Sequence, residues 1–180
     1  MRLDSKLRDV PAEERGKFLS LKYKELKLMH RIDRITDRYT TLSRLLEKSL
    51  QVITGFFQCR TASFLLGDGS WRKDEGFFFV TEAEHPENEK TAVKNLLKDF
   101  LAEPQVQCVM NEPPAELRQA GISNYLAIPM IINAEFAGAF LIANAGRPFN
   151  DDDIHFLRVI SSQLDNAVIY ARFREEYRKT

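Results

Sequence analysis

The stretch that decides the fold is Tyr125–Phe156, which reads YLAIPMIINAEFAGAFLIANAGRPFNDDDIHF. It contains two apolar runs, Leu126–Ile132 and Phe136–Ala143, joined by the short polar break Asn133–Glu135. Two such runs separated by about three residues predict an antiparallel hairpin. Neither run alternates cleanly between apolar and polar residues. This indicates that both faces of the hairpin are covered and that it lies in the middle of a sheet.

A helix start follows the hairpin directly. Gly146 and Pro148 end the second strand, and Asn150 can cap a helix whose first turn holds the acidic run Asp151–Asp153. Carboxylates are favoured there because the exposed amides and the helix dipole attract negative charge. Capping accounts for the acidic run without a metal ion, so we predict no metal site.

Upstream of the hairpin, an apolar stripe predicts a long helix from Phe18 onward. The seam repeats every three and four residues over about five heptads, and only Glu25 and Ser49 interrupt it. Such a stripe must pack on something, either a partner chain or the helix's own domain. We expect a homodimer, parallel or antiparallel, for the first half of the stripe and packing on the chain's own sheet for Leu42–Phe57. The expected dimer helix residues are Leu21, Leu28, Ile32, Ile35, Tyr39 and Leu42.

The hydrophobic pattern of the remaining chain predicts a mixed α+β domain. It predicts strands at Thr61–Leu66, Trp71–Val80 and Val106–Met110, and helices at Glu89–Ala102, Ala115–Ala120 and Asp151 to about Tyr177. We therefore divide the chain into a charged heptad helix, residues 1–41, and a domain, residues 42–180. The expected fold class is α+β: a central antiparallel sheet of about six strands, long N- and C-terminal helices on one face, and shorter helices and loops around a cavity on the other.

Composition narrows the class of protein. Basic and acidic residues both number 26, so the formal net charge is zero, which argues against a dedicated nucleic-acid binder. No apolar run approaches the ~20 residues that span a bilayer, and the first ten residues lack the apolar core of a secretory signal. The two cysteines have no paired spacing, so a cytoplasmic protein with reduced thiols is expected.

The residues above resemble a GAF domain, with a PAS domain as the nearest alternative. The resemblance covers roughly Leu42–Ala171. It rests on the segments LSRLLEKSLQVITGFFQCRTASFLLGDG, NYLAIPMIINAEFAGAFLIANAGRPFNDDDIHFL and ISSQLDNAVIYA. It implies a sensory and dimerising module, with an antiparallel sheet and a ligand cavity on the face away from the terminal helices.

The resemblance gives no support to a cyclic-nucleotide ligand. Family members that bind cyclic nucleotides often carry Asn-Lys, then a Phe with an acidic pair four and five residues later. Here Asn144 is followed by Ala145, and Phe149 is followed at those distances by Asp153 and Ile154. The match is therefore partial.

Two cysteine chemistries known in the family also lack their sequence context. Cys59 and Cys108 are followed by Arg60 and Val109, whereas bilin attachment commonly uses Cys-His. Neither cysteine has the Gly-rich context of the free methionine sulfoxide reductases, and no histidine is placed to activate a thiolate. We therefore predict no catalytic residues and identify no cofactor.

Two functions remain open. The first is a regulatory module that binds a small molecule and passes the change through its terminal helices to a downstream signalling domain or partner protein. The second is a dimerisation module whose interior is filled, and a cysteine enzyme is a distant third. A cavity is expected to be lined by Phe64, Phe78, Cys108, Leu117, Tyr125 and Ile128, with Arg118 and Asn124 as polar contacts.

Overall fold

The computed structural model describes residues 11–39, 41–67, 76–84, 86–102, 109–132 and 135–179. The elements in chain order are α1 (Ala12–Arg38), α2 (Leu42–Phe57), β1 (Cys59–Leu66), β2 (Phe77–Thr81), α3 (Pro86–Ala102), β3 (Val109–Met110), α4 (Ala115–Gln119), β4 (Tyr125–Ile132), β5 (Glu135–Ala145) and α5 (Asp151–Lys179). The described strands form one antiparallel sheet of five strands in the order β2-β1-β5-β4-β3. The predicted α+β class is confirmed, and the count of about six strands is not.

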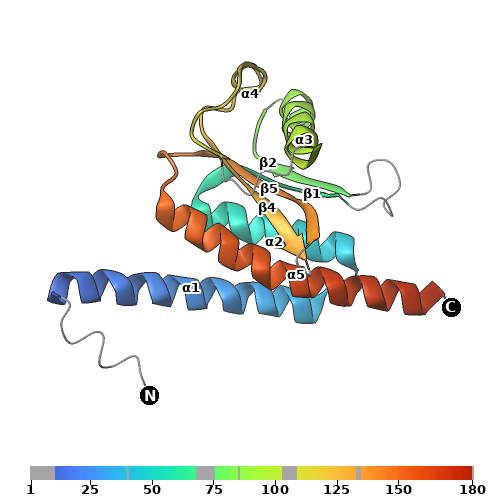
Figure 1. Ribbon diagram of the computed structural model, residues 1–180, viewed down its shortest axis with the longest axis horizontal. Coiled ribbons are helices and arrows are strands. Elements are labelled where there is room, and N and C mark those ends of the chain that lie inside the picture. Colours follow the sequence, from blue (N-terminus) through green and yellow to red (C-terminus); the bar gives the residue numbers. More distant parts are fainter. Residues whose placement is uncertain are drawn as a thin grey trace.

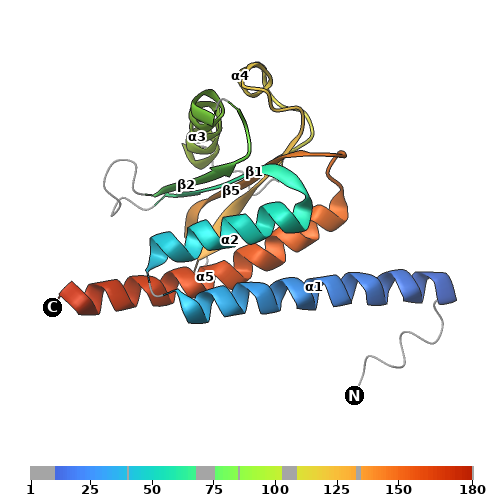
Figure 2. The same ribbon diagram turned by 180° about the vertical axis from the view of Figure 1, so that it is seen from behind.

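The helices form layers on the two faces of this sheet (Figure 1). Helices α2 and α5 cover one face, and α3 with α4 lies over the other. Helix α1 lies outside α2 and α5 as a further layer, as the view from behind also shows (Figure 2). The long first and last helices are thus on one side of the sheet, as expected, with α1 packed on α2 and α5.

The predicted hairpin is confirmed as the pair β4–β5, with β5 in the centre of the sheet. Side chains alternate between the faces, so Phe140 and Ile142 join the core under α2 and α5, whereas Leu141 and Ala143 face α3. All four are fully buried. Burial on both faces explains why the sequence of this strand shows no polar alternation.

The long N-terminal helix is interrupted, which the seam pattern did not predict. Helix α1 ends at Arg38, Tyr39 and Thr41 have extended backbones (φ −105°, ψ 121° and φ −103°, ψ 138°), and α2 then runs back along α1. Aromatic and β-branched residues are weak helix formers, so the segment tolerates the break. The heptad pattern persists because both helices bury their apolar side in one core.

That core takes up most of the residues expected in a dimer helix. Leu28, Ile32, Ile35 and Leu42 are at most 9% exposed within the single chain, and Leu21 and Tyr39 pack partly buried against them. In this structure the seam therefore belongs to the chain's own core, so a partner helix needs a different surface of α1.

In the described part of the chain, no helix is both long enough and apolar enough to cross a membrane.

Candidate functional site

The two faces of the sheet carry side chains of very different size. Under α2 and α5 the strands present large residues such as Phe64 and Phe140, whose rings lie 4.2 Å apart. Under α3 the strands present larger residues such as Tyr125 and Leu141, but several positions are small and fully buried: Ser63, Ala127, Ala139 and Ala143. Small strand residues leave room between a sheet and its covering helix, and this makes the α3 face the candidate ligand site.

Ser63 is the unusual residue on this face. It follows Thr61 and precedes Leu65 at alternate positions of β1, so all three point toward α3. Its side chain is 0% exposed, and its Oγ has no hydrogen-bond partner among the described residues. A buried hydroxyl without a partner destabilises a protein by about 1–3 kcal/mol, so such a group needs an explanation.

A buried polar network ties one end of α3 to the sheet. Glu89 of α3 is 0% exposed; its Oε1 accepts a hydrogen bond from Thr61 and lies 3.3 Å from the Oγ1 of Thr81. Its Oε2 lies 3.3 Å from an Nη2 of Arg60, and the same guanidinium nitrogen donates to the carbonyl of Gly121 at 3.2 Å. Arg60 therefore joins α3 to the turn after α4. We call the ion pair between Arg60 and Glu89, which closes this edge of the site, the latch.

The rest of the cover is apolar. Val93 and Leu97 of α3 are fully buried, and Leu117 of α4 and Ile122 after it are 1% exposed. Because Ser63 is closed off from solvent, a movement of α3 or the α4 segment gives a molecule access to it.

The residues predicted to line the cavity do not all come together. Tyr125 is on the α3 face and buried there, as is Leu117. The expectation for three other residues is corrected: Phe64, Phe78 and Ile128 do not face α3 but belong to the core under α2 and α5. The strand period of two puts them on the opposite face from Tyr125, Thr61 and Ser63.

The two predicted polar contacts have other roles. Arg118 is exposed on α4. The carboxamide of Asn124 pairs with the backbone of Ala145, donating to its carbonyl at 3.1 Å and accepting from its N–H at 3.0 Å. Cys108 lies outside the described residues.

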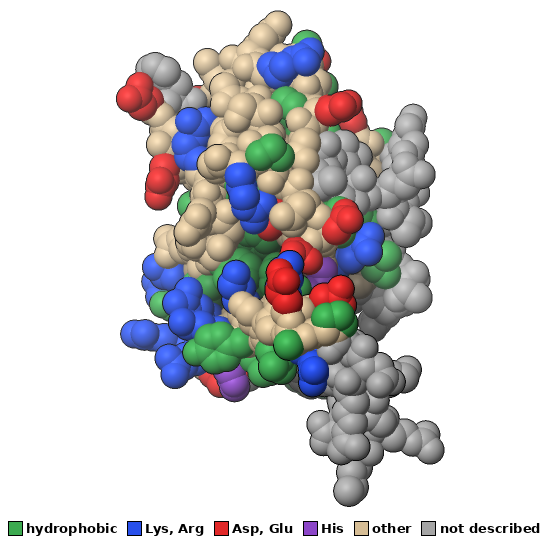
Figure 3. Space-filling view, turned by 90° about the vertical axis from the view of Figure 1, so that its left-hand side faces the viewer, with side chains coloured by type: hydrophobic (Ala, Val, Ile, Leu, Met, Phe, Trp, Pro, Cys, Tyr) green, Lys and Arg blue, Asp and Glu red, His purple; other side chains and the backbone are tan. Residues whose placement is uncertain are grey.

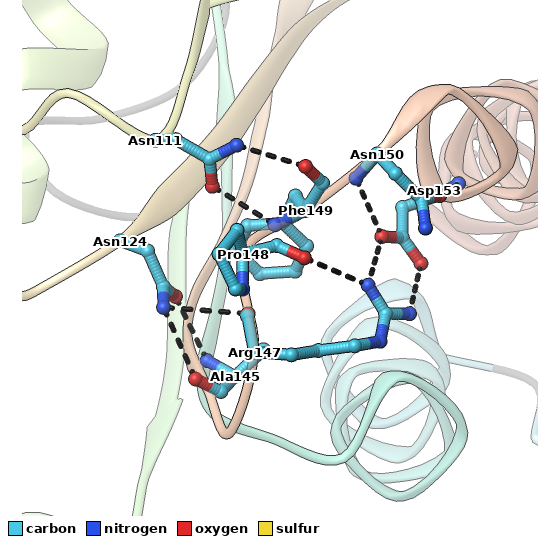
Figure 4. A network of polar contacts seen from close by, with 8 residues as sticks. All are labelled: Asn111, Asn124, Ala145, Arg147, Pro148, Phe149, Asn150 and Asp153. Carbon is cyan, nitrogen blue, oxygen red and sulfur yellow. Dashed lines mark hydrogen bonds and ion pairs between the residues drawn. The ribbon is translucent and has the colours of Figure 1, made fainter.

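Figure 4 shows that Asn124 belongs to a larger network around the turn before α5. Asn111, whose φ of 67° is left-handed, brackets Phe149 in the same way, with contacts of 2.8 and 2.9 Å. Asn150 Oδ1 accepts from the Asp153 N–H at 3.1 Å while Asp153 Oδ2 accepts from the Asn150 N–H at 2.8 Å. The predicted cap at Asn150 is therefore confirmed, as a reciprocal capping box.

Asn144, Phe149 and Asp153, which partly match the cyclic-nucleotide pattern, also hold loops and a helix end in place. Asn144, at φ 58°, accepts from the Ser123 N–H at 2.8 Å and donates to the Gly121 carbonyl at 3.1 Å. Phe149 is 3% exposed and Asp153 caps α5. The side-chain contacts seen here hold loops together.

Burial makes Cys59 a poor nucleophile. Its thiol lies within the core, and desolvation raises its pKa to about 12. Only a small fraction of such a thiol is thiolate at neutral pH. Among the described residues, no three His, Cys, Asp or Glu side chains gather closely enough to hold a metal ion.

The sequence signals for the α3-face residues were weak or absent. Ser63 is a polar residue inside the buried run TASFLL, and this could have marked it. The pairing of Arg60 with Glu89 joins residues 29 apart, and nothing local in the sequence indicates it.

The chain is similar to many solved structures at low sequence identity, among them the following three. The GAF domain of a protein assigned as a sensor histidine kinase from Pseudomonas syringae pv. tomato is 16% identical, with a TM-score of 0.62, covering 93% of this chain and 99% of that one. The GAF domain of a phosphoenolpyruvate-protein phosphotransferase from Acinetobacter is 14% identical, with a TM-score of 0.56 and coverage of 84% and 97%. Free methionine-R-sulfoxide reductase from Neisseria meningitidis, solved with its substrate, is 12% identical, with a TM-score of 0.57 and coverage of 82% and 90%.

These likenesses establish the fold, and no curated protein matches the chain in sequence. The family assignment comes from a separate comparison, in which the family model of the GAF domain matches residues 41–168, well over half of the chain. The chain belongs to the GAF domain family.

Proposed function

We propose that this chain is a sensory or regulatory signalling module that binds a small molecule between the sheet and α3. Binding displaces α3, and the terminal helices α1 and α5 pass the change to a downstream domain or partner protein. The observation that carries the proposal is Ser63, a fully buried hydroxyl without a partner among the described residues, on a sheet face that also carries three buried alanines.

The same fold in other proteins supports this function by analogy. One similar domain belongs to a protein assigned as a sensor histidine kinase, and another similar protein was solved with its small-molecule substrate. A fold alone does not decide function, which depends on the side chains of the α3 face.

The side chains of the α3 face define the class of ligand. Alanines and the apolar cover favour a compact, mostly apolar molecule, and Ser63 supplies one hydrogen bond, as donor or acceptor. Glu89 and Arg60 are already paired at the edge of this face. We propose that this ion pair breaks when α3 moves away from the sheet.

Replacing Ser63 by alanine is expected to stabilise the ligand-free protein while weakening ligand retention. Removing an unpaired buried hydroxyl raises the free energy of unfolding by about 1 kcal/mol. The matched control is Ser49→Ala on α2, because Ser49 is equally buried but donates to the Leu45 carbonyl at 2.8 Å. Its loss is expected to lower the free energy of unfolding by about 1 kcal/mol, measured by urea denaturation.

Native mass spectrometry of gently purified protein tests the ligand itself. The wild type and Ser49→Ala are expected to carry an added, releasable mass that Ser63→Ala carries in a much smaller fraction of molecules. A Ser63→Ala variant that is destabilised like Ser49→Ala contradicts the unpaired hydroxyl. Absence of any added mass, also after incubation with metabolite extracts, supports the ligand-free dimerisation module instead.

A second stripe on α1 supports assembly as a homodimer. Leu19, Tyr23 and Leu26 are 61%, 66% and 56% exposed, although they are spaced four and three residues apart like a heptad seam. They lie on the side of α1 opposite to Leu28 and Ile32, which α2 and α5 cover. The occupant that we propose is α1 of a second copy, because a two-fold axis matches this stripe with itself.

The variant Leu26→Glu is expected to raise the dimer dissociation constant by about 100-fold, because it buries a charge in the interface that the stripe forms. Ser20→Glu is the matched control, since Ser20 is exposed on the same helix, away from the stripe, and the charge change is the same. Sedimentation equilibrium measures both. A wild-type monomer, or equal effects of the two variants, contradicts this interface.

A further inference from the structure

A recess of about 600 Å³ lies on the other side of the sheet from the α3 face, at the end of the molecule where α1 and α5 begin. The recess is bordered by residues of three helices and a turn: Lys24 of α1, Phe56 and Gln58 at the end of α2, Gly146 and Arg147 of the β5–α5 turn, and Phe156 of α5. Three helices and a turn thus meet around one hollow of the size that holds small organic ligands.

The recess carries net positive charge. Arg147 forms two short contacts with Asp153, from Nη1 to Oδ2 at 2.6 Å and from Nη2 to Oδ1 at 2.7 Å (Figure 4). The same Nη1 donates to the Pro148 carbonyl at 2.9 Å. A guanidinium has five N–H donors, so two of them have no partner among the described residues. Among the residues that line the recess, Asp153 cancels one of the two cations, and Lys24, without a described ion pair or hydrogen bond, leaves a charge of about +1. The carboxylate of Asp152 also acts on Arg147 from outside the lining.

Further basic residues continue the line of Lys24 along α1. Lys24, Lys27 and Arg31 follow one another at spacings of three and four, so they form one edge of α1. Figure 3 looks onto this end of the molecule and shows a hollow that contains hydrophobic side chains, with basic side chains gathered on one side and acidic side chains on the other. This edge attracts anions toward the recess.

An aromatic wall makes the recess suitable for more than a bare ion. The ring of Phe56 meets Phe57 and Phe156 edge to face, with centroids 5.1 and 5.3 Å away, and is itself only partly buried. A flat apolar group can pack on such a wall while its charge stays beside the cations.

We propose that this recess binds a small organic anion, a planar apolar body bearing one phosphate or carboxylate group. Its anionic group lies between Lys24 and the free donors of Arg147, and its ring packs on Phe56 and Phe156. The ligand thereby joins α1 to the turn that starts α5. This site is separate from the α3 face and does not depend on the function proposed for it.

Phenyl phosphate is the probe for the test, compared with inorganic phosphate and benzyl alcohol in NMR titrations of the whole chain. The amides of Gln58 and Gly146 are expected to shift saturably, and phenyl phosphate is expected to bind at least about tenfold more tightly than either fragment. Lys24→Glu is expected to weaken it about tenfold, whereas Lys24→Arg stays within about twofold of wild type.

The matched control is Lys90→Glu, which makes the same charge change on the exposed surface of α3. It is expected to change the affinity by less than about twofold, since its charge is screened at that distance. Equal weakening by Lys24→Glu and Lys90→Glu overturns the proposal and leaves only a nonspecific charge effect. Shifts confined to Tyr125 and Ile122, or no saturable shift at all, also overturn it, and neither result bears on Ser63.

Discussion

Replacing Gly138 by alanine is expected to lower the free energy of unfolding by at least about 3 kcal/mol, at the upper end of the range for overpacking. Gly138 lies on the central strand β5, paired with Leu66 on one side and Met130 on the other. A Cβ at this position falls 2.4 Å from the carbonyl oxygen of Leu65 and 3.2 Å from the Cα of Leu66. Both are backbone atoms of an adjacent strand, so no side-chain rotation can relieve the overlap, and the strands must separate.

Gly146→Ala provides the control for this substitution. Gly146 follows the same strand, and a Cβ there meets nothing within 4 Å. Its stability is expected to stay within about 0.5 kcal/mol of wild type in urea denaturation. If both variants lose similar stability, the loss comes from replacing glycine in general, and the close approach of β1 to β5 is not the cause.

Sequence patterns predicted the parts of this fold whose signals are local. The hairpin β4–β5 and the cap at Asn150 each depend on residues that are close in the chain, and both were confirmed. Gly121, which follows α4, has a φ of 85°, a conformation that suits glycine, and Ile122 donates back to the Leu117 carbonyl at 2.9 Å. Such features depend on backbone geometry that few other residues permit.

The assignment of residues to the two faces of the sheet could not be predicted in the same way. Phe64 and Tyr125 are both apolar residues of buried strands, yet they lie on opposite faces. Alternation shows which residues of one strand share a face, but it gives no sign of which helices cover that face when both faces are buried. The break between α1 and α2 was missed for a related reason, since the seam continues through it.

The latch at the edge of the α3 face leads to the second large expected effect. Arg60→Ala is expected to lower the free energy of unfolding by about 3 kcal/mol, because it leaves the buried carboxylate of Glu89 without its cation. The Glu89 side chain is 1% exposed, so its carboxylate is desolvated, whereas that of Arg60 is 37% exposed, so water replaces part of what the guanidinium supplies. The loss stays at the lower end of the range for broken buried pairs, since hydroxyls of Thr61 and Thr81 still reach Glu89.

Adding Glu89→Gln to the Arg60→Ala variant separates charge from packing. The amide keeps the shape of Glu89 and still accepts from Thr61, but carries no charge that needs a partner. We expect the double variant to regain about 1–2 kcal/mol over Arg60→Ala in urea denaturation. Arg44→Ala, on the exposed side of α2, serves as the control and is expected to stay within about 0.5 kcal/mol of wild type. If Arg60→Ala loses less than about 1 kcal/mol, the pair does not hold α3 to the sheet, and the opening of this face needs another latch.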